Sequence, residues 1–207
     1  MSLQMLSSVG LLLGLFVSST FAAEPVRMGC GMMTFDTVPG WGLDAAGKSQ
    51  IGPTHGSVVI DSKGQIYTSS NLGIFVFTPD GTLVRRHLGG DYTSLHDMEI
   101  RTEDGRDFIY GARNAAGEGI KIDAETGAVV FKLGIPTEEE CGVKITKWSP
   151  TAITVAPNGE IYLSDGYASN RIFRFSPAGK YLSHFGTKGN GLKEFNTAHG
   201  MTLDTRY

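Results

Sequence analysis

Short segments in which apolar and polar residues alternate, separated by glycine-rich turns, recur along the chain from residue 53 onward. In residues 172–175, two phenylalanines fall on one face of an extended chain and an arginine on the other. The segments are rich in β-branched and aromatic residues, which favours strands over helices. We find no segment with the period of an amphipathic helix, so the pattern predicts an all-β protein.

The alternating segments form a repeat, and three copies can be read beside one another. They cover residues 53–67 with 73–84, then 96–100 with 104–110 and 119–130, then 150–165 with 171–182. A fourth copy begins at residues 199–204. The equivalent residues Tyr67, Tyr110 and Tyr162 are spaced by about 40–50 residues, the length of a four-stranded propeller blade.

Turn residues divide each repeat into short strands. Asp80, Asp104 and Asn158 each precede a glycine, and such dipeptides adopt the positive φ angles of hairpin turns. We therefore expect a β-propeller of four-stranded blades, with about three blades and one strand present. Residues 137–148 lengthen the second interval, between Tyr110 and Tyr162, and the acidic run 138–140 within them is expected to be a solvated loop.

The third copy carries a more specific resemblance. Residues 161–172 contain Ile-Tyr-Leu-Ser-Asp and Asn-Arg-Ile, and residues 179–195 continue with glycine-bounded Lys-Tyr-Leu-Ser-His-Phe and Leu-Lys-Glu-Phe. This stretch resembles a complete NHL repeat, and the resemblance extends over residues 53–207. It implies a six-bladed β-propeller. Because an open ring leaves an unpaired strand edge, we expect the sequence to be a fragment of such a ring.

The segment before the repeats has a different composition. Residues 11–17 form a short apolar run, followed by small residues before Ala23, which is typical of a signal peptide over residues 1–22. Residues 23–52 then form an N-terminal lead-in to the propeller at residues 53–207. We therefore expect a secreted, periplasmic or cell-surface protein with no membrane span after signal cleavage. Cys30 and Cys141 lie outside the repeats and are either a disulfide or two separate thiols.

Charge narrows the choice of partners. The net charge is −3 and no block of lysine and arginine occurs, so nothing indicates a nucleic-acid partner. We expect instead a small-molecule or peptide ligand in the central channel. Trp41 and Trp148 are expected to pack in the core or on blade faces.

Histidines recur at one position of the repeat. His96, Thr151 and His199 are equivalent, and the innermost strand of each blade faces the channel, so His96 and His199 should point at the axis from alternate blades. With one further ligand they would form a tris-histidine zinc site with an open coordination position. His96 and His199 could equally be hydrogen-bonded channel residues. His55 lies near the same level and is a further metal ligand, a substrate contact or a structural residue. His87 and His184 fall on outer strands and are expected to be exposed.

Residues 164–172 and 195–199 are also similar to peptidyl-α-hydroxyglycine α-amidating lyase, also called peptidylamidoglycolate lyase. The resemblance implies that Tyr167 is catalytic and that His96 and His199 bind zinc. It places the third zinc histidine in a blade after Tyr207. It places a catalytic arginine in the first blade, where this sequence has Thr54, His55 and Gly56 instead.

Tyr167 and Arg113 are the candidate catalytic residues. Tyr167 has no counterpart in the other repeats, which favours a functional role, although a packing role is common for tyrosine in such loops. Arg113 could supply a cation at the channel mouth or pair with a nearby acidic residue.

Three functions remain open from the sequence. The first is a metal-dependent carbon–nitrogen lyase that cleaves an α-hydroxyglycine-type bond. The second is a non-catalytic propeller that binds a protein, peptide or carbohydrate, because propellers host both roles. Lactonase-type chemistry is less favoured, since such sites use carboxylates and amides around a hard metal.

Overall fold

The computed structural model describes residues 23–204 and residue 206, so the predicted signal peptide lies outside the described residues. The chain divides into two compact units, residues 1–40 and 41–207. The first unit contains one hairpin of β1 (Arg27–Cys30) and β2 (Met33–Asp36). An ion pair of 2.8 Å between Arg27 and Asp36 joins the open end of this hairpin.

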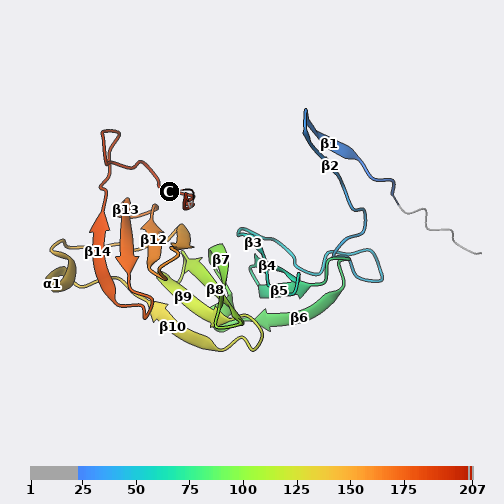
Figure 1. The fold of residues 1–207 in the computed structure, drawn as a ribbon, viewed down its shortest axis with the longest axis horizontal. Coiled ribbons are helices and arrows are strands. Elements are labelled where there is room, and N and C mark those ends of the chain that lie inside the picture. The colour runs from blue at the N-terminus through green and yellow to red at the C-terminus, as the bar shows by residue number, and fades with distance from the viewer. Residues whose placement is uncertain (1–22, 205, 207) are drawn as a thin grey trace, which may run out of the picture. The chain divides into compact units, whose positions relative to one another are not determined.

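The second unit contains three four-stranded antiparallel sheets, each built from strands consecutive in the chain. Blade 1 consists of β3 (Val58–Ile60), β4 (Ile66–Ser70), β5 (Gly73–Phe77) and β6 (Leu83–Leu88). Blade 2 consists of β7 (Leu95–Glu103), β8 (Arg106–Arg113), β9 (Glu118–Asp123) and β10 (Val129–Leu133). Blade 3 consists of β11 (Ala152–Val155), β12 (Ile161–Asp165), β13 (Arg171–Phe175) and β14 (Tyr181–Phe185). The blades follow one another around an arc, with β6, β10 and β14 on its outer side (Figure 1).

Helix is confined to single turns in the described residues. These are the 3-10 turn η1 (Gly90–Tyr92) and the helix α1 (Glu138–Cys141). The fold class is therefore as predicted, an all-β propeller with three blades. Within the part of the chain that the structure describes, no helix is long and apolar enough to cross a membrane.

The hydrophobic core lies between neighbouring blades. The central strands carry apolar side chains on both faces, as in β5, where every residue is buried. The cluster between blades 1 and 2 includes Tyr67, Ile74, Val76, Leu95, Met98, Ile109 and Ile120. The cluster between blades 2 and 3 includes Phe108, Tyr110, Leu133, Ile153, Leu163 and Phe173. Each blade is thus stabilised mainly by the apolar surface that it buries against the next one.

Carboxylates of β7 hold the inner strands of the three blades together. The Asp97 carboxylate accepts hydrogen bonds from the hydroxyl of Ser57, just before β3, and from the backbone N–H of Ile153 in β11, the latter at 3.0 Å. The Glu99 carboxylate accepts from the N–H of Val155 at 3.3 Å. These bonds satisfy backbone donors that have no strand partner on the channel side of β11.

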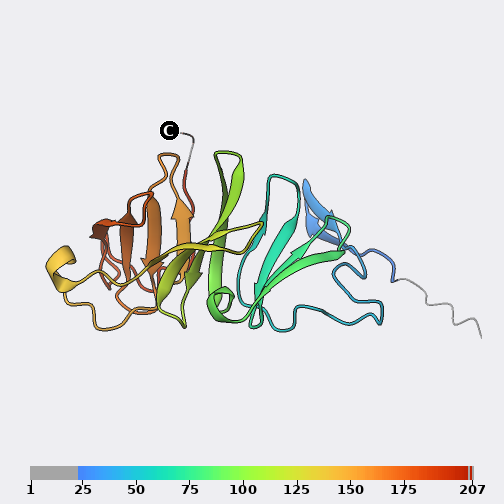
Figure 2. The same ribbon diagram turned by 90° about the horizontal axis from the view of Figure 1, so that it is seen from below.

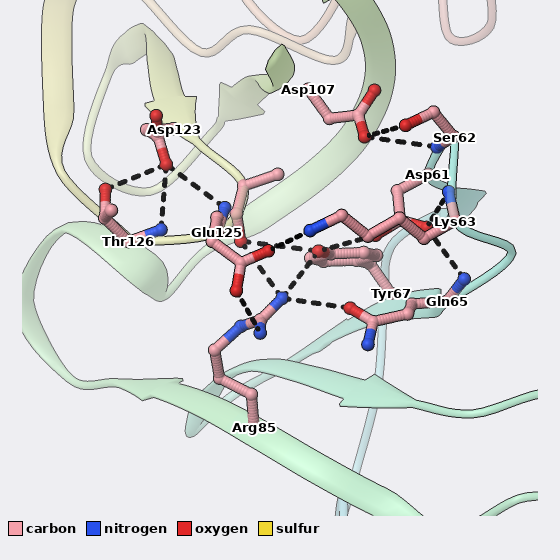
Figure 3. Close-up of polar contacts among 11 residues, drawn as sticks. Asp61, Ser62, Lys63, Gln65, Tyr67, Arg85, Asp107, Asp123, Glu125 and Thr126 are labelled. Carbon is pink, nitrogen blue, oxygen red and sulfur yellow. Dashed lines mark hydrogen bonds and ion pairs between the residues drawn. The ribbon is translucent and has the colours of Figure 1, made fainter. Parts of the chain in front are cut away.

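Polar side chains on and beside the turns that follow β3 and β9 form a seam between blades 1 and 2 (Figure 3). Lys63 pairs with Glu125 at 2.7 Å, and Arg85 donates to the Tyr67 hydroxyl at 2.8 Å. Burial raises the pKa of Tyr67 to about 12. Turned by 90°, the three blades show their strand ends gathered at two opposite edges (Figure 2). The seam is formed by the turns that follow β3 and β9, near the last residues of β7, whereas His96 is near the first residue of β7. The seam and the predicted histidine site therefore lie at opposite ends of this strand.

Four expectations need correction. Residues 199–204, the expected start of a fourth blade, form no strand, because no strand among the described residues lies beside them to pair with. The acidic run at residues 138–140 is exposed as expected, but it forms the helical turn α1, capped by Thr137. His87 is buried because Tyr92, with its ring 5.4 Å away, and Gly127 lie against its imidazole. His184 is half-buried beside Tyr181, to whose hydroxyl its Nδ1 lies at 2.8 Å.

Other residues are placed as expected. Trp41 packs on Phe77 with ring centroids 5.0 Å apart, so part of the predicted lead-in belongs to the blade unit. Trp148 packs edge-on against Phe173. Both cysteines, Cys30 and Cys141, are free thiols.

Candidate functional site

A β-bulge at the start of blade 2 places His96. Leu95 faces Arg113 and Asp97 faces Ala112, which leaves His96 as the extra residue in β7. Bulges turn a side chain out of the regular alternation and are common beside active sites. The imidazole of His96 is consequently directed away from its own sheet toward blade 3, and the residue is 8% exposed.

Hydrogen bonding fixes the tautomer of His96. Its Nδ1 lies 2.8 Å from the carbonyl oxygen of Thr151, which can only accept, so Nδ1 carries the proton. Burial lowers the pKa of His96, and the neighbouring His199 and His55 lower it further. The ring is therefore neutral near pH 7, and Nε2 can act only as an acceptor or a metal ligand.

The Tyr167 hydroxyl lies between two imidazoles. It is 3.1 Å from Nε2 of His96 and 2.7 Å from Nε2 of His199. Because Nε2 of neutral His96 can only accept, the hydroxyl donates to His96 and accepts from the Nε2–H of His199. Tyr167 is 48% exposed, so its hydroxyl combines a fixed position with access from solvent.

Hydrogen bonds to the preceding residue position His199. The carbonyl oxygen of Ala198 accepts from the hydroxyl of Thr151 at 2.6 Å and from that of Ser164 at 2.9 Å. Gly166 makes the approach possible, since a Cβ there would lie 1.9 Å from the same carbonyl oxygen. Thr151 thus holds His96 through its carbonyl and His199 through its hydroxyl.

His55 is the third imidazole of the cluster. Its ring centroid lies 4.7 Å from that of His96, and ligand atoms of His55, His96 and His199 all lie within 4.8 Å of one another. These three histidines could hold a metal ion. Metal binding, one of the alternatives that the sequence left open for His55, is compatible with this geometry.

Arg113 belongs to a different environment. Its guanidinium donates to the carbonyl oxygens of Thr93 at 2.9 Å and Gly90 at 2.7 Å, and it pairs with Asp91 and Glu118. Through these contacts the Arg113 side chain holds η1 and Thr93, which precede β7, in place. The predicted catalytic role of Arg113 therefore gains no support from its contacts.

Open space borders the histidine cluster on two sides. A pocket of about 420 Å³ is lined by His55, Asn71, Ser94, Asn114 and Tyr167, among others, and contains no carboxylate, lysine or arginine from the described residues. A second pocket of about 280 Å³ is lined by His96, Asp97, His199 and Met201, among others. A ligand at the uncharged pocket would meet the exposed tyrosine directly.

The sequence did not reveal the supporting residues. Thr151 was aligned with the histidines, but its contacts with both depend on how blade 3 packs against blade 2. Ser164 and Gly166 stand in the same stretch as Tyr167, and their contact with Ala198 involves a segment more than thirty residues later in the chain. The only supporting residue with a sequence signal was Gly166, because a glycine can indicate that another backbone segment approaches closely.

Comparison with known proteins gives several partial matches, while no family model matches the chain. It is 34% identical over 88 residues to the probable peptidyl-α-hydroxyglycine α-amidating lyase of Caenorhabditis elegans, covering 40% of this chain and 24% of that protein. It is 36% identical over 59 residues to the peptidyl-glycine α-amidating monooxygenase of Mus musculus, covering 26% of this chain and 6% of that protein. The human NHL repeat-containing protein 3 is 27% identical over 147 residues, which is 64% of this chain and 40% of that protein.

Among solved structures, a streptogramin B lyase superposes with a TM-score of 0.51 at 14% identity, covering 72% of this chain and 44% of that one. The hydrazine synthase of Kuenenia stuttgartiensis gives 0.51 at 11% identity, covering 69% and 38%. Identities this low show the fold alone. The chain spans less than half the length of the relatives that it matches. It is similar to peptidyl-α-hydroxyglycine α-amidating lyases and to NHL repeat proteins, as its sequence motifs predicted.

Proposed function

We propose that the protein is a zinc-dependent carbon–nitrogen lyase that cleaves α-hydroxyglycine-type substrates into an amide and glyoxylate. The observation that carries this proposal is the Tyr167 hydroxyl, which contacts Nε2 of both His96 and His199. A tyrosine placed among imidazoles that could hold a metal suits proton transfer next to that metal. The similarity to lyases of this substrate class supports the same chemistry.

The donor set fits zinc. Three imidazoles are the protein ligands of one common type of catalytic zinc site, which keeps a fourth position for water or substrate. The hydrogen bond from Nδ1 of His96 to the Thr151 carbonyl is the outer contact that normally orients a ligating histidine. Bound zinc would supply a Lewis acid that lowers the pKa of the substrate hydroxyl.

Tyr167 is proposed to relay a proton: its oxygen takes the hydroxyl proton of the substrate while its own phenol proton passes to the leaving nitrogen. The electron pair of the broken O–H bond forms the carbonyl of glyoxylate, and the electron pair of the C–N bond leaves with nitrogen. The nitrogen takes up the proton that the Tyr167 phenol gives and departs as the amide. The uncharged pocket beside Tyr167 gives the substrate room to place its hydroxyl against the phenol.

The test is glyoxylate release from an N-acyl-α-hydroxyglycine by zinc-loaded protein. Tyr167→Phe keeps the ring and removes the acid–base group, so kcat should fall by about 100-fold or more while zinc content is unchanged. Tyr162→Phe, on the strand that leads to the same turn, is the matched control and should retain the wild-type rate. A folded, zinc-loaded protein that releases no glyoxylate would overturn the proposal and favour a binding module.

A further inference from the structure

A separate pocket on blade 3 is lined by positively charged side chains. It has a volume of about 210 Å³ and is lined by Lys144, Lys147, Ser169 and Arg171, together with Ile145, Thr146 and Ala168. The lysines come from the segment after α1, Ser169 from the turn between β12 and β13, and Arg171 from the start of β13. No carboxylate lines this pocket in the described part of the chain.

The three cations of this pocket have no ionic partner. Among the described residues, Lys144, Lys147 and Arg171 form no ion pair. Arg174, three residues further along β13, pairs with Glu160 at 2.6 Å. The positive charge of the pocket is therefore left uncompensated, whereas charge elsewhere on the same blade is neutralised.

The carboxylate nearest in the strand register does not neutralise the pocket either. Asp165 faces Arg171 across the β12–β13 pairing, but it is fully buried and accepts the backbone N–H groups of Ser149 and Ser169 at 2.6 and 2.8 Å. Both of its oxygens are thus used to fold the two segments that form the pocket. Asp165 shapes the pocket walls and leaves the arginine free for another anion.

Two polar atoms of the pocket residues are buried with no hydrogen-bond partner. These are Oγ of Ser169 and Nε of Arg171, and the one hydrogen bond of the guanidinium is a long one, 3.4 Å from Nη1 to the Ser169 carbonyl. Buried polar groups are nearly always bonded, so an unpartnered hydroxyl and guanidinium N–H on two residues of one pocket indicate a missing acceptor. An anion supplies acceptors and no competing donors.

We propose that this pocket binds an oxyanion, the phosphate or carboxylate group of a small ligand. The guanidinium of Arg171 offers N–H donors in a fork that suits such a group, Ser169 adds a hydroxyl, and the two lysines add flexible charge. Ala168 lines this pocket and the adjacent Tyr167 lines the uncharged one, so a bound anion would hold the turn that carries Tyr167. The site uses none of the three histidines and is independent of the lyase proposal.

The experiment is calorimetric titration of the metal-free chain with inorganic phosphate, and separately with succinate, after the chelator has been dialysed away. Without metal at the histidine cluster, the anion cannot bind to that metal, so the titration reports on the pocket of blade 3. We expect one site per chain whose affinity falls as ionic strength rises. Tighter binding of phosphate or of succinate identifies which oxyanion the pocket prefers.

Variants locate the binding. Arg171→Gln should weaken binding by at least about 10-fold. The double variant Lys144→Gln with Lys147→Gln, which changes only exposed side chains, should weaken it as well. Lys188→Gln removes one exposed positive charge outside the pocket and should bind as the wild type does. No binding of either anion, or equal weakening in Lys188→Gln, would overturn the proposal.

Discussion

At the scale of single residues, the site depends on which ring nitrogens carry protons. The Thr151 carbonyl fixes a proton on Nδ1 of His96, and this fixes the Tyr167 hydroxyl as a donor to His96 and an acceptor from His199. One backbone carbonyl therefore fixes which atoms donate and which accept along the whole hydrogen-bonded chain from Thr151 to His199. The sequence could name the three side chains, but the backbone atom that orders them has no sequence signal.

Thr151 is expected to act as a positioning residue. Thr151→Val keeps the shape of the side chain but removes the hydroxyl that binds the Ala198 carbonyl, so His199 loses an anchor. We expect zinc affinity to fall by about 10-fold or more, as for other outer contacts of metal ligands. Competition with a chromogenic chelator measures this affinity.

Two further variants separate positioning from packing. Thr151→Ser keeps a hydroxyl and should restore most of the affinity. Thr154→Val changes a buried threonine of the same strand whose side chain makes no hydrogen bond among the described residues, and it should bind zinc normally. Equal affinity in Thr151→Val and the wild type would remove the positioning role.

His87 should make stability depend on pH. Burial lowers the pKa of His87 in the folded protein, whereas in the unfolded chain a histidine takes up a proton near its ordinary pKa of about 6.5. The unfolded state therefore binds more protons below that pH, and the free energy of unfolding should fall as the pH drops through it. Urea unfolding at about pH 7.5 and about pH 5.5 measures the change.

His87→Phe keeps a ring against Tyr92 and removes the titrating group. The loss of stability between the two pH values should be smaller in this variant than in the wild type. His96 and His184, whose pKa values are also lowered by burial, remain in both proteins and contribute equally to the comparison. An identical loss in both proteins would show that His87 does not carry the effect.

At the scale of elements, the strands could be predicted and their contacts could not. Alternation and turn glycines placed the blade strands, since these signals depend on neighbours in the chain. In the β7–β8 turn, Asp104 and Gly105 both have positive φ, as the dipeptide predicted. The bulge at His96 and the burial of His87 depend on contacts between different strands and turns, where no local pattern reports them. The same holds for the hydrogen bonds of Arg113 to the carbonyl oxygens of Gly90 and Thr93.

Asp97 links the inner strands of all three blades, and its loss should be costly. Asp97→Asn keeps the size but replaces one acceptor oxygen with an N–H₂ donor, which leaves either Ser57 or the N–H of Ile153 without an acceptor. We expect the free energy of unfolding to fall by about 1–3 kcal/mol. Asp104→Asn, at an exposed turn where asparagine also adopts positive φ, should change stability little. Equal stability of both variants in urea would contradict the link.

At the scale of the whole molecule, the fold gathers a site from widely separated positions. His55, His96 and His199 come from before blade 1, the start of blade 2 and the segment after blade 3. The repeat showed that two of them are equivalent, because equivalent positions of consecutive blades face the same channel. It did not show that His55 lies within reach of both, since the spacing between blades depends on side-chain packing in the two core clusters.

The zinc content of the wild type and of single histidine variants tests the central claim most directly. Elemental analysis after zinc loading and gel filtration should find one zinc per chain in the wild type. His55→Ala, His96→Ala and His199→Ala should each lose most of this zinc while remaining folded, and His184→Ala, a half-buried histidine of β14, should keep it. Zinc content that stays at one per chain in all three cluster variants, or that is absent from the folded wild type, would contradict a metal site built by these histidines.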